Sequence, residues 1–576
     1  MIAPAATLPV RLPVWRARLL LLVLVASSLV LVGRAFYLQG VNKDFLRQKG
    51  EARYSRVITL NANRGNILDR NGEPLAISTP VESVAASPRD VEITPEQTAR
   101  LARLLGLTVA ELKRKLDDKR EFVYLKRQLP PDQAEQVLKL DIPGVFLQRE
   151  YRRYYPYGEQ TAHLLGFTDV DDRGQEGVEL AFNDRLAGIN GSRRVLKDRL
   201  GNIIEGVESI RAPQDGQPVV LSIDRNIQYL AYRELQNAVI QHRAKAGAVV
   251  VLDAQTGEVL ALANQPSYNP NRRSKDVPPA YMRNRVVTDI FEPGSTLKPF
   301  TAAMALEADR VRPDTVIQTA PGYLTIGPAT IRDAHAAGAL TVAQVIQKSS
   351  NVGAAKMALM LPAEYMADRF RKLGFGAPPG VGFPGEAAGR VRPPQTWRPI
   401  EQATMSYGHG ISVSLLQLAR AYTVFANDGE LRELSLLKLD RPAPSRPVFS
   451  AATARAVRGM LELVVQPGGT APRAQVPGYR VAGKTGTAHK LNANGTYAED
   501  RYVASFVGMA PASDPRLIVA VMIDEPSAGQ YYGGQVAAPV FAQIMAGALR
   551  MLSVPPDAPG GAFFSPDAAP VVGEAT

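Results

Sequence analysis

Apolar residues in the second half of the chain fall into two pairs of short runs that enclose a long stretch of helical periodicity. The first pair lies within 247–262, on either side of a turn, and predicts a β-hairpin. The second pair, 502–509 and 517–523, predicts another two strands. Helical periodicity between them includes 414–427 and 451–465. Strands from both ends of a domain, with helices between, favour an α+β fold with one mixed sheet.

The stretch 41–222 mixes short strand-like runs with short helices. Thr94 and Thr108 each begin a capping-box pattern, with Gln97 and Glu111 three residues later, and leucines follow on one helix face. No spacing typical of catalysis occurs in this stretch. It therefore predicts a non-catalytic pedestal or interaction domain that precedes a second domain at 223–552.

Residues 19–38 form an apolar run in which Arg34 is the single charge. A helix of about 20 such residues spans the ~30 Å apolar core of a bilayer, and Arg34 can reach the interface. Three arginines and no acidic residue precede the run, which predicts a signal anchor with residues 1–18 in the cytoplasm and the rest exported. A cleaved signal peptide is the alternative, but no small-residue cleavage site follows the apolar core.

Composition narrows the chemistry. The absence of cysteine excludes disulfides, a thiol nucleophile and a cysteine-ligated metal, and the five histidines form no His-Glu-x-x-His motif. We therefore expect no metal and no cofactor. The net charge of +12 is spread along the chain rather than gathered in a stripe, so no nucleic-acid partner is expected. Prolines among alanine and glycine predict a disordered tail at 553–576.

A candidate nucleophile is Ser295. On a helix Lys298, three residues later, shares its face and can act as its base. Pro299 requires this to be the first turn, where unpaired N–H groups favour a developing anion. The spacing alone is weak, because Ser435 and Lys438 repeat it.

Two further motifs follow in a fixed order. Ser349 and Asn351 form a Ser-x-Asn, a hydroxyl and an amide able to relay a proton and hold a lysine. A Lys-Thr-Gly at 484–486 occurs once in the chain, on a predicted edge strand. The decoy Ser-x-Asn at Ser267 and the decoy Ser-x-x-Lys at Ser435 fall outside the order.

The order Ser-x-x-Lys, Ser-x-Asn, Lys-Thr-Gly is typical of penicillin-binding proteins and serine β-lactamases. Four longer segments carry a closer resemblance: Glu-Pro-Gly-Ser at 292–295, Lys-Ser-Ser-Asn-Val-Gly at 348–353, Arg-Gly-Asn-Ile-Leu-Asp-Arg-Asn-Gly at 64–72 and Tyr-Tyr-Pro-Tyr-Gly at 154–158. Over roughly 16–552 the sequence resembles the class B penicillin-binding proteins, most closely the division-specific, penicillin-binding protein 3 type. The resemblance implies a serine β-lactamase-like transpeptidase domain behind an elongated non-catalytic domain and one transmembrane helix.

The resemblance also implies the chemistry: serine acyl transfer from a D-Ala-D-Ala stem peptide to a neighbouring stem-peptide amine, which crosslinks septal peptidoglycan. By resemblance, the main-chain N–H groups of Ser295 and Thr487 form an oxyanion hole, worth about 3 to 4 kcal/mol per donor. The implied catalytic residues are Ser295, Lys298, Ser349 and Asn351, and the implied substrate-binding residues are Lys484, Thr485, Gly486 and Thr487.

The implied setting is the bacterial inner membrane at the division septum, with the catalytic domain in the periplasm. Expected partners are stem peptides, β-lactams as covalent inhibitors, a lipid-linked glycan polymerase and other division proteins. A D,D-carboxypeptidase, or a relative that hydrolyses β-lactams, would share the acylation machinery.

A P-loop NTPase is a further alternative, because 478–485 matches G-x-x-x-x-G-K-[ST]. That loop requires a buried strand before it and a helix after it, whereas prolines precede this segment and a turn follows. An exported domain also meets no ATP. A scaffold that kept the fold without activity is disfavoured by the intact nucleophile, base and strand motif.

β-Lactams should act as long-lived, stoichiometric inhibitors. Class A β-lactamases hydrolyse the acyl-enzyme with a water activated by a glutamate in a Glu-x-x-Asn segment between the second and third motifs. None of the glutamates in 352–483 is followed three residues later by Asn; they are Glu364, Glu386, Glu401, Glu430, Glu433 and Glu462. With a chromogenic cephalosporin we expect one burst equal to the enzyme concentration; many turnovers per site within minutes would contradict this.

Overall fold

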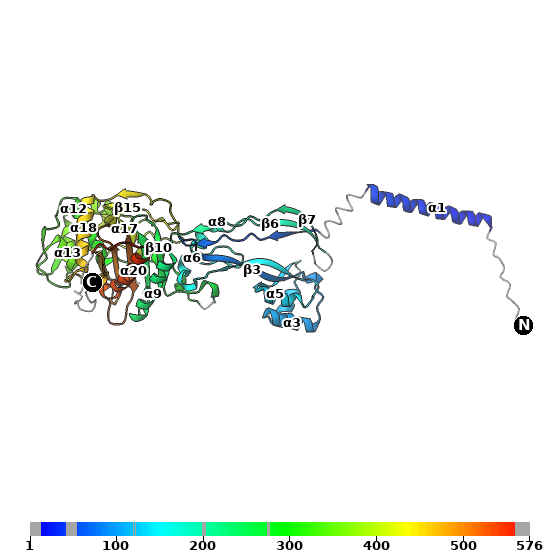
Figure 1. Ribbon diagram of the computed structural model, residues 1–576, viewed down its shortest axis with the longest axis horizontal. Coiled ribbons are helices and arrows are strands. Elements are labelled where there is room, and N and C mark those ends of the chain that lie inside the picture. The colour runs from blue at the N-terminus through cyan, green and yellow to red at the C-terminus, as the bar shows by residue number, and fades with distance from the viewer. Residues whose placement is uncertain are drawn as a thin grey trace. The chain divides into compact units, whose positions relative to one another are not determined.

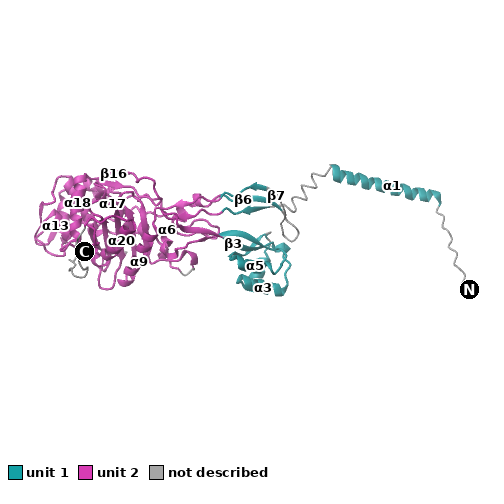
Figure 2. Cartoon of the chain, viewed as in Figure 1, with its two compact units in different colours: residues 1–62, 80–151, 189–214 teal, residues 63–79, 152–188, 215–576 magenta. Residues whose placement is uncertain are grey.

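The computed structural model describes residues 13–41, 55–118, 120, 122–197, 203–273, 277–492 and 494–558 (Figure 1). The chain divides into two compact units (Figure 2). Unit 1 comprises Met1–Ala62, Pro80–Tyr151 and Ile189–Gln214, and unit 2 comprises Asn63–Thr79, Arg152–Gly188 and Asp215–Thr576. Both units are therefore discontinuous in sequence, unlike the contiguous division at residue 222 predicted from the sequence. The first part of the predicted cytoplasmic segment, 1–12, lies outside the described residues.

The apolar run forms one long helix. Helix α1 spans Val14–Phe36 and continues into a π-helical turn, Tyr37–Val41. The helical stretch Val14–Gly40 has 27 residues and contains an 18-residue window with a mean hydropathy of 2.4, none of which is buried in the protein. By length and composition this helix is able to cross a membrane. This fits the predicted single-pass anchor at 19–38.

Unit 1 combines a small helical cluster with two groups of strands. Both predicted capping boxes are present, at the starts of α3 (Pro95–Leu105) and α4 (Val109–Leu116). Leu101, Leu105 and Leu112 are buried in one core with the neighbouring strand. The remaining elements of unit 1 are α5 (Pro131–Leu138), β4 (Val123–Leu129), and β1 (Ser55–Leu60), β6 (Gly191–Lys197) and β7 (Ile203–Arg211), which form a three-stranded antiparallel sheet. Strands β3 (Pro74–Ala86) and β5 (Val145–Tyr154) contribute residues to both units.

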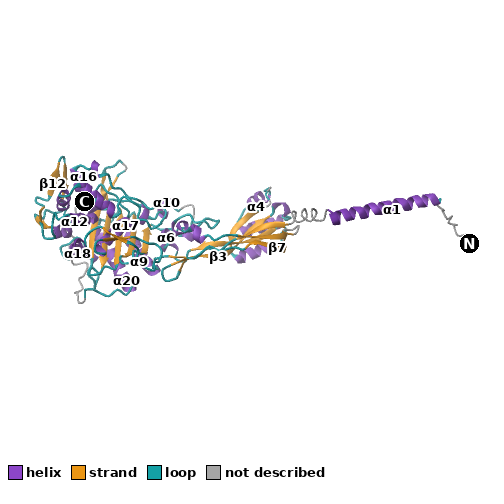
Figure 3. Ribbon diagram, turned by 90° about the horizontal axis from the view of Figure 1, so that it is seen from above, coloured by secondary structure: helices purple, strands orange, loops and turns teal. Residues whose placement is uncertain are grey.

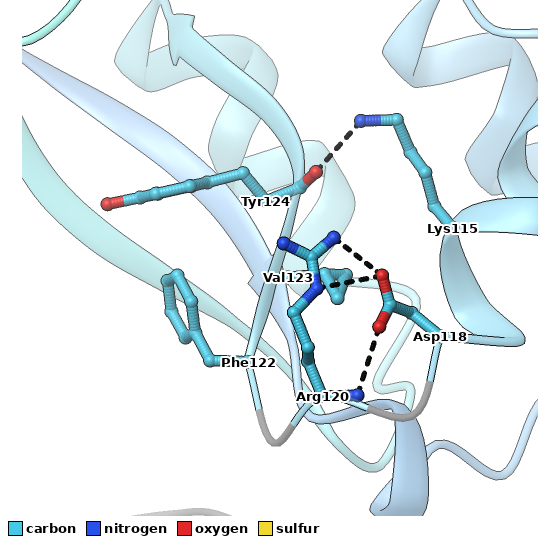
Figure 4. Close-up of a pocket in the computed structure, with 6 residues that line it drawn as sticks. All are labelled: Lys115, Asp118, Arg120, Phe122, Val123 and Tyr124. Carbon is cyan, nitrogen blue, oxygen red and sulfur yellow. Dashed lines mark hydrogen bonds and ion pairs between the residues drawn. The ribbon is translucent and has the colours of Figure 1, made fainter.

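Unit 1 also holds a pocket of about 420 Å³ (Figure 4). Its charged side chains are paired within the unit: Lys115 Nζ donates to the carbonyl of Tyr124 at 2.9 Å, and Arg120 pairs with Asp118. Phe122 supplies an apolar side of the lining. The pocket contains no nucleophile next to a base, so it offers no acyl-transfer chemistry.

The segment 64–72 in unit 2 is fixed by a buried ion-pair cluster. Glu179, fully buried, accepts hydrogen bonds from Arg64 Nε at 2.7 Å and from Arg153 Nε at 2.6 Å. Gly65 lies so close to a neighbouring segment that a Cβ there would be 2.2 Å from the carbonyl oxygen of Gln217. The segment 64–72, which resembles the family, therefore contributes to packing within unit 2.

The sheet of unit 2 joins strands from both ends of the domain, as the sequence predicts. Its order is β10-β9-β19-β18-β17. The strands are β9 (Ala246–Asp253), β10 (Val259–Gln265), β17 (Ala482–Leu491), β18 (Tyr497–Ala510) and β19 (Leu517–Asp524). All pairings are antiparallel, so the prediction of a mixed sheet is not met in this respect. Each hairpin is antiparallel, and the register Leu517↔Asp253 to Asp524↔Ala246 joins the two hairpins in the same sense.

Helices surround this sheet (Figure 3). Every residue of β9 and β19 is buried, which requires cover on both faces. Helices α9 (Arg225–Gln241) and α20 (Ala538–Met551) pack on each other and on the sheet; α17 (Leu415–Ala426) packs on the sheet and on α18 (Ala451–Val465). The other elements of unit 2 are α6 (Ala162–Leu165), α7 (Gly177–Ala181), α8 (Asn183–Leu186), α10 (Pro279–Met282), α11 (Arg285–Thr288), α12 (Lys298–Glu307), α13 (Val342–Lys348), α14 (Asn351–Leu359), α15 (Ala363–Lys372), α16 (Pro399–Met405), α19 (Gly533–Val536), β2 (Ile67–Leu68), β8 (Val219–Val220), β11 (Val316–Gln318), β12 (Tyr323–Ile326), β13 (Ala329–Arg332), β14 (Ala339–Thr341), β15 (Glu430–Arg432) and β16 (Ser445–Pro447).

The prediction of disorder from residue 553 onward is wrong for residues 553–558, which pack against unit 2. The hydroxyl of Tyr479 donates to the carbonyl of Val554 at 2.6 Å. Asp557 accepts from the main-chain N–H of Arg480 at 2.7 Å. The prolines suggested an unstructured segment, but these hydrogen bonds hold it in place. The rest of the predicted tail, 559–576, lies outside the described residues.

Replacing Glu179 by Ala should lower the free energy of unfolding by about 3 to 5 kcal/mol, because two buried guanidinium groups lose their counter-charge. Thermal or denaturant unfolding measures this. Asp368→Ala is the matched control: Asp368 pairs with Lys372 on the surface of α15, where both side chains are over 40% exposed, and such a pair contributes about 0 to 1 kcal/mol. Equal losses in the two variants would contradict the assignment.

Candidate active site

The hydroxyl of Ser295 lies within hydrogen-bond distance of the amine of Lys298. Ser295 belongs to a 3-10 helix, η5 (Gly294–Leu297), and Lys298 is the first residue of α12, with Pro299 in its first turn. Lys298 Nζ donates to Ser295 Oγ at 2.9 Å. Both residues are buried, with exposed fractions of 3% and 0%. The pair therefore meets at the start of a helix, where the proline predicts it.

The hydroxyl of Ser349 is shared by two lysines. Ser349 ends α13 in the left-handed conformation, with φ of 60°. Its Oγ accepts from Lys298 Nζ at 3.0 Å and from Lys484 Nζ at 2.9 Å. Its carbonyl also accepts from Lys298 Nζ at 2.5 Å. A continuous chain of hydrogen bonds thus links Ser295, Lys298, Ser349 and Lys484.

The start of α14 is fixed from outside the three motifs. Ser350 caps this helix, and its hydroxyl donates to Asp333 Oδ2 at 2.7 Å. The other carboxylate oxygen of Asp333 accepts from the main-chain N–H of Val352 at 3.0 Å. Asp333 therefore holds the turn that places Ser349 and Asn351.

Asn351 differs from the other predicted catalytic residues. Its Nδ2 donates to the carbonyl of Arg332 at 3.1 Å. Its Oδ1 is buried and has no hydrogen-bond partner among the described residues. Asn351 is thus buried two residues after Ser349, and its side chain makes no hydrogen bond with Lys298 or Lys484.

The Lys-Thr-Gly segment lies on β17, the edge strand of the sheet, as predicted. Thr485 Oγ1 lies 3.2 Å from Lys484 Nζ and 2.8 Å from the hydroxyl of Thr470. Thr487 Oγ1 accepts from the main-chain N–H of Gly533 at 3.0 Å. Thr470 and Gly533 therefore orient the two threonines, and no spacing in the sequence points to either residue.

Glycines allow β17 to lie directly against the segment that carries Ser295. A Cβ on Gly486 would come within 2.8 Å of the carbonyl oxygen of Pro293, and a Cβ on Gly294 would come within 3.3 Å of the carbonyl oxygen of Thr487. Gly294 also has φ of 58°, where a side chain is strained. The role of Gly486 in the structure is thus close approach of the strand to η5.

Near Ser295 lie three rings and one carboxylate that no sequence motif predicted. They are those of Glu292, Tyr407, His409 and Tyr497. Burial, followed by the charge of Lys298 and then His489, lowers the pKa of His409 to about 4, so the ring is uncharged at neutral pH. Burial raises the pKa of Glu292. Gly408 and Gly410, on either side of His409, are the sequence signal that the main chain packs closely against another segment here.

The decoy motifs lie in other surroundings. The hydroxyl of Ser435 donates to the carbonyl of Leu437, and its segment pairs with Glu258 rather than beginning a helix. Ser267 Oγ donates to the carbonyl of Glu159. The P-loop alternative fails as well, because Gly483 to Thr485 lie inside β17 and the chain continues as a strand.

Among the described residues, no group of three or more His, Cys, Asp or Glu side chains is placed to hold a metal ion.

Comparison with known proteins matches residues 247–546 to the penicillin-binding protein transpeptidase domain and residues 59–221 to the penicillin-binding protein dimerisation domain. The chain therefore belongs to the penicillin-binding protein transpeptidases, and within that class to the FtsI, or penicillin-binding protein 3, type. This confirms the family predicted from the order of the three motifs.

Similar proteins include the probable peptidoglycan D,D-transpeptidase PenA of Neisseria gonorrhoeae, 48% identical over 534 residues, which are 92% of this chain and 91% of that protein. The peptidoglycan D,D-transpeptidase FtsI of Escherichia coli K12 is 44% identical over 551 residues, 94% of this chain and 93% of that protein. The apo transpeptidase domain of Burkholderia pseudomallei penicillin-binding protein 3 is 52% identical, with a TM-score of 0.55, and the match covers 59% of this chain and 98% of that structure.

Lys298→Ala should slow acylation by a penicillin by about 10² to 10⁴, the usual range for a positioned general base. Stopped-flow or quench measurements with a fluorescent penicillin give the rate constant. Lys438→Ala, in the decoy motif, is the matched control and should leave it unchanged. A loss smaller than tenfold in Lys298→Ala would mean that another group accepts the Ser295 proton.

Proposed function

We propose that this protein crosslinks septal peptidoglycan by serine acyl transfer from a D-Ala-D-Ala stem peptide to the amine of a neighbouring stem peptide. The observation that carries the proposal is the buried chain of hydrogen bonds from Ser295 through Lys298 and Ser349 to Lys484. It joins a nucleophile, a base and a proton relay, which is what acyl transfer without a cofactor requires.

In the first step Ser295 Oγ attacks the carbonyl carbon of the penultimate D-Ala, and its proton passes to a neutral Lys298 amine. The bond to the terminal D-Ala nitrogen then breaks. The departing amine takes a proton through the Lys298, Ser349 and Lys484 relay, and an ester on Ser295 remains.

Negative charge on the attacked carbonyl oxygen is stabilised by the main-chain N–H groups of Ser295 and Thr487. The close approach of η5 to β17, which the two glycines permit, supports this pairing. A lost donor of this kind costs about 3 to 4 kcal/mol of transition-state stabilisation.

The terminal carboxylate of the donor is bound by Lys484, Thr485 and Thr487 at the edge strand. The cation of Lys484 lies beside the hydroxyl of Thr485, so charge and hydrogen bonding act on the same group. Asn351 acts through its buried Oδ1, which is available to orient Lys298 or the donor amide when a substrate is bound.

The second step is attack of an acceptor amine on the ester. The amine loses a proton to the relay, Ser295 Oγ leaves and regains its proton, and an amide crosslink forms. The carboxypeptidase and β-lactamase alternatives need water in place of the amine, and no Glu-x-x-Asn segment lies between the second and third motifs, where class A β-lactamases carry their base.

The proposed setting is the inner membrane at the septum. Helix α1 would anchor the chain with its N-terminus in the cytoplasm, 223–552 would act in the periplasm, and 41–222 would serve as a pedestal for a lipid-linked glycan polymerase and other division proteins. The arginines before the apolar run support this orientation.

Ser295→Ala should abolish covalent labelling by a fluorescent penicillin while the melting temperature stays close to that of the wild type, because one hydroxyl carries the bond and little packing. Gel fluorescence and peptide mass measure the adduct. Ser435→Ala, the decoy, should label normally. Labelling of the Ser295→Ala protein would refute the proposed nucleophile.

Removal of residues 1–40 should release a soluble protein that still reacts with penicillin, because α1 is the one helix among the described residues long and apolar enough to span a bilayer. Fractionation of cells, followed by labelling, tests this. If the truncated protein stays with the membrane after a high-salt wash, a second attachment exists.

A further inference from the structure

Glu292 bridges two segments that are far apart in the sequence. Its Oε1 accepts from the main-chain N–H of Gly410 at 2.8 Å, and its Oε2 accepts from the hydroxyl of Tyr497 at 2.9 Å. Tyr497 begins β18, 205 residues away from Glu292. One carboxylate, three residues before Ser295, therefore joins the strand next to β17 to the loop 407–410.

The loop 407–410 is itself fixed against the nucleophile's segment. A Cβ on Gly408 would lie 2.3 Å from the carbonyl oxygen of Gly294, so main chain packs on main chain there. Phe291 and Val413 exchange two hydrogen bonds of 3.0 Å, which continue the contact on the other side of Glu292. The loop 407–410 thus has a fixed position relative to Ser295. Glu292 holds the side chain of Tyr497 next to this loop.

The bridge places three rings in a row. The centroid of His409 lies 5.1 Å from that of Tyr407 and 5.5 Å from that of Tyr497. Tyr407 is buried, whereas Tyr497 is 44% exposed and packs less. The hydroxyl of Tyr497 makes the hydrogen bond that Glu292 accepts, and this bond fixes the ring beside the uncharged His409.

We propose that Glu292 is a positioning residue for the acyl donor: it holds Tyr497 against His409, so that the rings form one wall of the donor site beside Ser295. An uncharged aromatic wall suits the alkyl groups and amide planes of a peptide or of a β-lactam side chain. This inference rests on the proposed acyl transfer at Ser295.

A wall of this kind acts on binding rather than on bond making. Its contacts are made equally before and during attack, so loosening it weakens the encounter complex and leaves the maximal acylation rate constant unchanged. A brace needed only for folding would instead lower the melting temperature or the fraction of active protein, without changing the affinity of the active molecules.

The test uses the full chain in detergent and a fluorescent penicillin, with acylation rates measured over a range of concentrations. Tyr497→Phe removes one hydroxyl and keeps the ring. It should raise the half-saturating concentration about 3- to 10-fold, the usual weight of one hydrogen bond. The maximal rate constant should stay within about twofold. Tyr281→Phe, at another exposed tyrosine, is the control and should change neither value.

Two variants of Glu292 separate geometry from charge. Glu292→Gln keeps an oxygen for Gly410 and offers an amide to the Tyr497 oxygen, so it should stay within about twofold of the wild type. Glu292→Ala should match or exceed Tyr497→Phe, and the double variant should equal Glu292→Ala alone, because both remove the same contact.

Unchanged half-saturation in Tyr497→Phe, a change in the maximal rate constant alone, additive effects in the double variant, or a Glu292→Gln protein as impaired as Glu292→Ala would each overturn the inference. Failure of the proposed function reads differently: the wild-type chain itself would then form no adduct at Ser295.

Discussion

The hydroxyl of Ser349 is the point on which the site depends, because the amines of Lys298 and Lys484 meet there from two different elements. Ser349 reaches both through a left-handed backbone conformation that interrupts the chain between α13 and α14. That conformation is unfavourable for a residue with a side chain. It is held by the capping of α14, in which Asp333 binds the hydroxyl of Ser350. The position of the Ser349 hydroxyl is thus set by how two short helices join.

Close packing supplies the second constraint. Gly486, Gly533 and Gly534 lie where added side chains would meet main-chain atoms, so β17 contacts η5 on one side and α19 on the other without intervening side chains. The threonines of β17 are then oriented by fixed partners rather than by solvent. Such preorganised donors act without rearrangement during the reaction.

Local patterns predicted much of this. The capping residues of α3 and α4, both hairpins of the sheet, and the first-turn position of Ser295 and Lys298 follow from spacings within a few residues. Contacts between distant segments did not follow. Nothing near Glu292 points to Tyr497, and nothing near Thr485 points to Thr470, because each partner is chosen by the tertiary fold.

The discontinuity of unit 2 determines when this domain can assemble. Asn63–Thr79 and Arg152–Gly188 leave the ribosome first, yet their compact unit is completed by Asp215–Thr576. Arg70, for example, pairs with Glu258, and Asn71 binds Asp224. During synthesis the early segments must therefore wait, with their apolar surface uncovered, until more than half of the chain has followed. Shielding of the nascent chain during synthesis is therefore a requirement of the fold's topology.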